Sequence, residues 1–136
     1  MRSVATLAIL SLGLICGCNK QPSASATSNA LNCILQIAGE KRVQNPTEAD
    51  IREAIWSMDT KKGGAFLVME LSKMTYIQAS GDQRMGFEME YQEADIQHHY
   101  RAKRRFTADE VVNALTFYAV GDDKWKGTAE WELIKW

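Results

Sequence analysis

The pattern of apolar and polar residues in the middle of the chain predicts an antiparallel sheet. Four short runs, over residues 66–71, 75–80, 87–92 and 97–101, are rich in aromatic, β-branched and other apolar residues. Polar joints of turn length separate these runs. Strand-like runs joined by short loops are typical of a β-meander. We therefore expect residues 65–102 to form a meander at the centre of the fold.

The run 87–92 alternates strictly between apolar and polar residues. Phe87, Met89 and Tyr91 point to one side of a strand, while Glu88 and Glu90 point to the other. The predicted sheet is therefore covered on one face and open to water on the other. The run 66–69 is entirely apolar, which predicts a central strand buried on both faces.

A first helix is predicted over about residues 46–59. Asn45 suits the N-cap, Pro46 the first helical position, and Glu48 the acidic position of a capping box. Apolar residues then recur with the helical period on one face, at Ile51, Ala54, Ile55 and Met58.

A second helix is predicted over about residues 108–120. Thr107 and Glu110 form a capping-box pair at its start, and Gly121 suits its end. Together with short extended segments at 32–37 and 129–134, these elements predict an α+β fold. We expect an antiparallel sheet of about five strands with the two helices packed on one face.

Composition indicates one ordinary globular domain. The chain has 136 residues, of which 46% are hydrophobic and 24% charged, and its formal net charge is −1. A charge this close to zero gives no signal for nucleic acid as a partner. The sequence contains no Gly-rich phosphate loop, serine elbow or dinucleotide fingerprint, and we expect no cofactor.

The N-terminus has the pattern of a targeting segment. Arg2 precedes an apolar run over 4–15, which is shorter than the roughly 20 residues that a membrane-spanning helix needs. The sequence Ile15-Cys16-Gly17-Cys18 follows, with an aliphatic residue at −3 and a small residue at −1 relative to the last cysteine.

This pattern resembles the lipobox of bacterial lipoproteins. The resemblance implies that the signal peptide 1–17 is cleaved and that the thiol of Cys18 carries a diacylglycerol, which anchors the protein to membrane lipid in the cell envelope, facing the periplasm. Asn19 stands where enterobacterial lipoproteins of the inner membrane carry Asp, which favours the outer membrane. An ordinary cleaved signal and an uncleaved anchor are the alternatives.

Residues 18–30 are predicted to be the lipidated cysteine and a flexible tether, and residues 31–136 a single globular domain. The segment after Cys18 is rich in Ser, Ala, Thr and Asn and cannot bury enough apolar surface to order itself. A coil of about a dozen residues spans roughly 20 Å. In the domain, Cys33 is interpreted as a small buried residue, with a reactive thiol as the alternative.

Four acidic residues form a candidate partner-binding surface. Glu88 and Glu90 lie on the predicted open strand face, and Glu93 and Asp95 follow them in the next joint. A basic partner is one interpretation, and a solvated face kept charged for solubility is the other. Trp136 is the candidate for an exposed anchor at an interface.

Histidines, basic residues and tryptophans have simpler interpretations. His98 and His99 are adjacent on a strand and face opposite ways, so no metal site is predicted. The cluster Arg101-Ala102-Lys103-Arg104-Arg105 suits anionic headgroups or, alternatively, a solvated joint paired with the acidic strands. Trp125 and Trp131 suit either an interface or the core.

The domain also resembles small α+β domains of bacterial genomes, some of which are grouped with the immunity proteins of polymorphic toxin systems. The residues that carry this resemblance are Asn45, Pro46, Glu48, Asp50, Ile51, Tyr76, Ile77, Gln78, Glu90, Tyr91, Tyr100, Arg101, Ala102 and Trp125. They are mostly cap and core positions, which define a fold. The lipobox departs from the usual cytosolic forms and disfavours inhibition of a nuclease.

We therefore expect a non-catalytic binding module tethered to the membrane, with toxin inhibition as the sharpest version and an unidentified protein as partner. The alternative is a structural or housekeeping envelope lipoprotein that binds the cell wall or an assembly partner. An enzyme using Glu88, Glu90 and a histidine is the least favoured hypothesis, because catalysis needs a pocket around such carboxylates.

Replacing Cys18 by Ser tests the predicted anchor. The thiol is the acceptor of the diacylglycerol, so Cys18→Ser is expected to leave an unprocessed or unlipidated chain. Fractionation of cells and gel mobility measure this directly. A Cys18→Ser protein that still fractionates with membranes and migrates as the mature lipoprotein contradicts the prediction.

Overall fold

The computed structural model describes residues 31–63 and 65–136, which form an α+β fold. A seven-stranded sheet has the order β2-β1-β3-β4-β5-β6-β7, and every neighbouring pair is antiparallel. The strands are β1 (Ile34–Ile37), β2 (Lys41–Gln44), β3 (Phe66–Ser72), β4 (Thr75–Asp82), β5 (Gly86–Gln92), β6 (His99–Ala102) and β7 (Trp131–Leu133). The predicted meander is confirmed, because β3 to β6 are neighbours in chain order.

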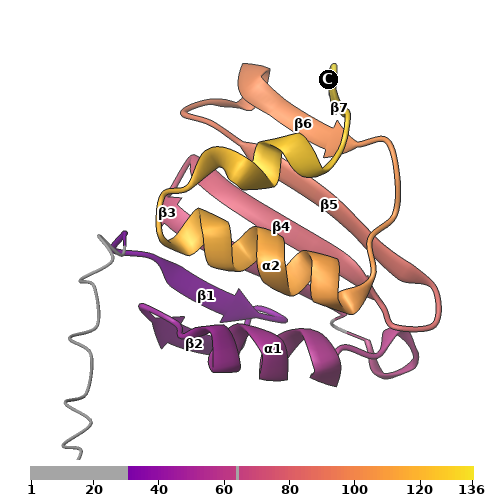
Figure 1. Ribbon diagram of the computed structural model, residues 1–136. Helices are drawn as coiled ribbons and strands as arrows, with labels where there is room; N and C mark the ends of the chain where they lie inside the picture. Colours follow the sequence, from indigo (N-terminus) through magenta and orange to yellow (C-terminus); the bar gives the residue numbers. More distant parts are fainter. Residues whose placement is uncertain (1–30, 64) are drawn as a thin grey trace, which may run out of the picture.

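Two α-helices, α1 (Glu48–Ser57) and α2 (Ala108–Ala119), lie side by side on one face of the sheet (Figure 1). Helix α1 connects the edge strand β2 to β3 and so carries the chain past β1. Their buried residues are Ile51, Ala54 and Ile55 in α1, and Val111, Val112, Ala114, Leu115, Tyr118 and Ala119 in α2. The expectation of two helices on one face is confirmed.

Helix α1 begins two residues later than the sequence predicts. Its N-cap is Thr47, whose hydroxyl accepts from the Asp50 N–H at 3.2 Å, while the Asp50 carboxylate accepts from the Thr47 N–H at 2.8 Å. The predicted box of Asn45 and Glu48 is therefore wrong. Asn45 adopts a positive φ of 49°, and its side-chain oxygen accepts from the Cys33 N–H at 3.2 Å. Asn tolerates this conformation, so it ends the β1–β2 ladder instead of starting the helix.

The capping box of α2 is confirmed. The Thr107 hydroxyl accepts from the Glu110 N–H at 3.3 Å, and the Glu110 carboxylate accepts from the Thr107 N–H at 2.8 Å. The helix ends at Ala119, and Gly121 follows with a φ of 72°, as the sequence predicts. The bare Gly121 backbone also leaves room for the Leu31 side chain, which would lie 3.3 Å from an added Cβ.

The core lies between the helices and alternate positions of the central strands. These positions are buried and are Leu67, Met69, Ile77, Ala79, Phe87, Met89 and Tyr91. The expectation that the run 66–69 is buried on both faces is wrong, because Phe66 is 42% exposed and Val68 is only half-buried. Both α-helices cover the opposite face, and apolar side chains are tolerated at an exposed strand surface.

The C-terminal tail returns to the sheet and completes the core. A 3₁₀ segment, η3 (Asp123–Thr128), places the buried Trp125 at 4.9 Å from Tyr91 between ring centroids, edge to face. Trp131, at the start of β7, contacts the same tyrosine ring at 4.9 Å. The predicted closing strand within 129–134 and the core interpretation of these two tryptophans are confirmed. Trp136 is 79% exposed.

The sheet has more strands than the predicted number of about five. The clearest miss is β2, whose residues Lys41, Arg42, Val43 and Gln44 include a single apolar side chain. This strand is at an edge of the sheet and pairs only with β1. Charged residues on edge strands discourage pairing with other chains, and they also erase the alternation that identifies a strand in a sequence.

The predicted signal peptide 1–17, the lipidation site Cys18 and the tether 18–30 lie outside the described residues. Among the helices that the structure describes, none has the length and apolar character needed to cross a bilayer.

Two phenylalanines on opposite faces of the sheet give a stability test. Phe87 is completely buried, so Phe87→Ala is expected to lower the free energy of unfolding by about 3–5 kcal/mol through lost burial and a cavity. Phe66→Ala on the open face is expected to cost less than about 1 kcal/mol. Urea unfolding of both variants measures the difference. Equal losses would contradict the assignment of the two faces.

Candidate functional site

The face of the sheet opposite the α-helices is the candidate site, and we call it the open face. Because side chains alternate along a strand, the pairing of β1 with β3 and of β3 through β6 defines its members. They are Ile34, Gln36, Phe66, Val68, Glu70, Tyr76, Gln78, Ser80, Glu88, Glu90, Gln92, His99 and Arg101.

Over β1, β3 and β4 the open face carries apolar side chains interspersed with Gln36, Glu70, Gln78 and Ser80. Phe66 and Val68 on β3 are exposed or half-buried, and Ile34 on β1 and Tyr76 on β4 are half-buried beside them. Among the described elements, the two α-helices lie on the opposite face of the sheet (Figure 1). Aromatic and aliphatic groups held on rigid strands, with part of their surface in water, are suited to burial against another molecule.

The part of the open face formed by β4, β5 and β6 is organised around Glu90. The Glu90 carboxylate accepts from the Gln78 side-chain amide at 2.8 Å and from the Arg101 guanidinium at 2.8 Å. His99 shares a third hydrogen bond with the same carboxylate at 3.2 Å. The Glu90 side chain is only 17% exposed as a result. The carboxylate therefore accepts from donors on both neighbouring strands and links β4, β5 and β6.

His99 and Gln92 are buried polar residues beside this network. The His99 ring is edge-on to Tyr76 at 6.1 Å and lies 5.6 Å from the Trp136 ring, between centroids. The Gln92 amide donates to the Met74 carbonyl at 3.3 Å, and its oxygen accepts from the Tyr76 hydroxyl at 3.4 Å. Burial, and secondarily the Glu90 charge, raises the pKa of Tyr76, so the phenol stays neutral.

The four predicted acidic residues do not form one acidic patch. Glu88 and Glu90 are on the open face, where Glu88 pairs with Arg105. Glu93 and Asp95 lie in the β5–β6 connection instead. Glu93 pairs with Lys126 at 2.6 Å, and Asp95 contacts His98 at 2.8 Å. The hydrogen bond from His98 lowers the pKa of Asp95.

The basic cluster before α2 is paired with acidic residues. Arg101 contacts Glu90 at 2.8 Å and Arg104 contacts Glu110 at 3.0 Å. Arg105 pairs with Glu88, as noted above, and Lys103 approaches Glu130 at 3.3 Å. The exposed cluster is thus paired in part with the acidic strands, as the sequence predicts for a solvated joint, and in part with α2 and the C-terminal segment. Such exposed pairs contribute little stability, about 0–1 kcal/mol each, but they fix the pattern of charge on the surface.

The histidine pair has the predicted divergent geometry. His99 is buried on the open face, whereas His98 is exposed and contacts Asp95. His99 is the first residue of β6, and Tyr76 and Trp136 flank its ring, whereas His98 ends the preceding 3₁₀ segment and does not lie on the strand where the sequence places it. Within residues 31–63 and 65–136, no group of three His, Cys, Asp or Glu side chains converges on a point that could hold a metal ion.

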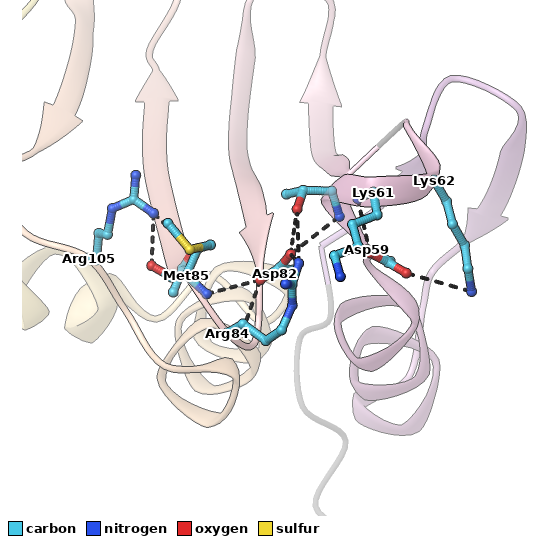
Figure 2. Close-up of polar contacts among 9 residues, drawn as sticks. Asp59, Lys61, Lys62, Asp82, Arg84, Met85 and Arg105 are labelled. Carbon is cyan, nitrogen blue, oxygen red and sulfur yellow. Dashed lines mark hydrogen bonds and ion pairs between the residues drawn. The ribbon is translucent and has the colours of Figure 1, made fainter.

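Asp82 is a structurally important residue that the sequence did not reveal. It lies within a segment predicted to be a polar turn, yet it is 3% exposed at the end of β4. Figure 2 shows Asp82 with Arg84 and Met85 around it. The Asp82 carboxylate accepts from the Thr60 hydroxyl at 2.5 Å and from the backbone N–H groups of Arg84 and Met85 at 2.9 Å. These donors, with the Thr60 hydroxyl the strongest, hold the pKa of Asp82 well below its usual range. The sequence feature that could have indicated this role is the position of Asp82 in a turn, two residues before Arg84. Asp side chains at such positions often accept a hydrogen bond from the backbone two residues further on.

A shallow hollow of about 490 Å³ lies beside Asp82. Its lining includes the exposed ring of Trp56 and the side chains of Lys61 and Arg84. The Arg84 guanidinium is already bound to Asp82 at 2.9 Å. The carboxylate therefore joins the β4–β5 turn to the 3₁₀ segment η1 (Thr60–Lys62), which is a structural task.

Cys33 is 1% exposed within the core, and burial raises the pKa of its thiol. A buried, protonated thiol is a poor nucleophile. The interpretation of Cys33 as a small core residue is confirmed.

No protein-family model, no curated protein and no solved structure matches the chain.

The pH dependence of stability tests the role of Asp82. Its folded-state pKa is depressed below the value of about 3.9 for an unfolded chain, so its contribution to stability is fully present above that pH and is lost progressively as the pH falls from there toward the folded-state pKa. Asp82→Asn is expected to lower the urea midpoint at pH 7. The difference from the parent protein should be smaller at pH 3 and should shrink further as the pH is lowered toward the folded-state pKa.

Asp109→Asn is the control for loss of one carboxylate. The Asp109 side chain is 69% exposed and pairs with Arg52 at the surface, so its removal should leave the midpoint at pH 7 nearly unchanged. An Asp82→Asn difference that is the same at pH 7 and pH 3 would be inconsistent with a low pKa in the folded protein.

Proposed function

We propose that the protein is a lipid-anchored envelope lipoprotein that acts as a non-catalytic binding module, with the open face as its partner-binding surface. The observation that carries the proposal is the open face of the sheet, on which Phe66 and Val68 remain accessible near Tyr76. A protein partner of mixed apolar and polar character fits this surface. Toxin inhibition, as in immunity proteins, is the sharpest version of this proposal.

The lipid anchor is supported by the motif at Cys18, and the described part of the domain begins shortly after the predicted tether. The Leu31 N–H donates to the Ala119 carbonyl at 2.9 Å, and the Leu31 side chain fits beside Gly121. The globular domain thus starts at a fixed point directly after the segment assigned to the tether. Two or three acyl chains at Cys18 would give durable attachment to a bilayer.

Binding without catalysis is supported by the state of the carboxylates. Glu90 accepts hydrogen bonds from Gln78, Arg101 and His99, so its oxygens are occupied by protein groups. Glu88 is half exposed and is paired with Arg105 through one of its oxygens. A general base needs a free oxygen near a substrate, and a raised pKa if it is to act near neutral pH. An ion-paired face is better suited to setting the orientation of a partner through charge complementarity.

Crosslinking on intact cells with a C-terminally tagged lipoprotein tests the proposal. Val68→Lys places a charge beside the exposed Phe66 on the open face. We expect it to reduce capture of the main partner by roughly tenfold or more, which corresponds to about 1.4 kcal/mol of binding free energy. Mass spectrometry of the crosslinked species identifies the partner and measures its yield.

Asn113→Lys is the matched control, because it adds the same charge at an exposed position of α2 on the other side of the molecule. One dominant partner that is lost in Val68→Lys and retained in Asn113→Lys supports the open face. Equal capture by both variants contradicts it. Capture of only abundant wall and outer-membrane proteins favours the housekeeping alternative, and hydrolysis of a wall substrate that is lost in Glu90→Gln favours an enzyme.

A further inference from the structure

The chain enters the sheet at the start of β1, and we call this end of the sheet the proximal end. Across β1, β3, β4, β5 and β6 the register aligns a single row at this end, formed by Ile34, Glu70, Tyr76, Gln92 and His99. Leu31 lies at the same end. It lines a small cavity of about 120 Å³ together with Thr75 and Gln92. The segment leading back to Cys18 therefore leaves the domain at its proximal end.

Large apolar side chains are exposed along this end. Met74, in the β3–β4 turn, lies beside Gln92, whose amide donates to the Met74 carbonyl. Trp136 contacts the His99 ring from the other side. A groove of about 540 Å³ connects Trp136 to Ile96, which is 50% exposed. The exposed apolar groups thus follow one rim of the domain, from the β3–β4 turn to the C-terminus.

The charges of this rim favour contact with anionic groups. Lys73 and Lys135 are exposed and have no ion-pair partner among the described residues. Most acidic side chains of the same end have a basic or histidine partner, although Glu93 and Asp123 share one. These contacts are Glu70 with Arg42, Glu93 and Asp123 with Lys126, Asp95 with His98, and Asp122 with Lys124.

We propose that the proximal end rests on the surface of the bilayer, with Trp136, Ile96 and Met74 at the level of the lipid headgroups. This inference rests on the proposed lipid anchor. The predicted tether from Cys18 to Leu31 would span roughly 20 Å as a flexible coil, which would keep this end close to the surface. Tryptophan is favoured at membrane–water interfaces, and each lysine near an anionic surface contributes about 1 kcal/mol.

The contact gives the open face a defined orientation. The strands run from the proximal end to the opposite end, where Trp56 is 49% exposed and Asp82 closes the β4–β5 turn. With the proximal end on the bilayer, the strands point away from the membrane. The open face then stands to the side, accessible to a partner instead of pressed against lipid.

Fluorescence quenching by brominated lipid tests the inference on the full, lipidated chain. The protein is reconstituted into vesicles of phosphatidylethanolamine and phosphatidylglycerol, and flotation establishes whether it is anchored. Two variants each remove one exposed tryptophan, Trp136→Phe at the proximal end and Trp56→Phe at the opposite end. We expect Trp136→Phe to lose roughly half or more of the quenching, and Trp56→Phe to retain it.

The outcomes separate the inference from the anchor. A chain that floats, but is quenched equally in the two variants or loses quenching only in Trp56→Phe, overturns the proposed contact and leaves the lipid anchor intact. A chain that does not float overturns both. The buried Trp125 and half-buried Trp131 are common to both variants, so their contribution cancels in the comparison.

Discussion

The fold depends on the burial of one face of the sheet under two helices. The alternate residues Met69, Ile77, Met89 and Tyr91 point into the core from neighbouring strands, and their register is fixed by cross-strand pairing. A slip of one residue in β5 would turn Glu88 and Glu90 into the core and Phe87 into water. Such a slip would cost far more than the net stability of about 5–15 kcal/mol that a domain of this size retains. The same constraint that builds the core therefore leaves the opposite face uncovered and decides which residues it displays.

Elements with strong local signals were predictable from the sequence. The capping box at Thr107 and the alternation of β5 are both set by neighbouring residues, and both are confirmed. The start of α1 was misplaced because Asn45 suits two roles, an N-cap and a left-handed residue at the end of a hairpin, and only the contact with Cys33 selects the second. β2 and the burial of Asp82 depend on partners that are distant along the chain, so no local pattern indicated them.

The candidate site shows the same division. The sequence correctly placed Glu88 and Glu90 on the wet face, because period-two alternation is local. Their partners Arg101 and Arg105 were predicted only as a group, since the pairing depends on how β5, β6 and the segment before α2 meet in space. This pairing changes the character of the surface. A row of free carboxylates would select for positive charge alone. Fixed ion pairs near the exposed Phe66 and the half-buried Val68 would instead select for a partner whose charged and apolar groups match this arrangement.

Anchoring and orientation act together on such a surface. The proposed lipid anchor would confine the domain to a layer near the membrane and would raise its effective concentration for any partner in that layer, without a new contact. Confinement alone leaves the domain free to rotate, so that the open face would meet a partner in only a fraction of encounters. A second contact through Trp136 and the rim around it would restrict that rotation while leaving Phe66 and Val68 accessible. Association is limited by the orientational requirement of docking two patches, so restricted rotation would raise the association rate even where the contacts at the interface are modest.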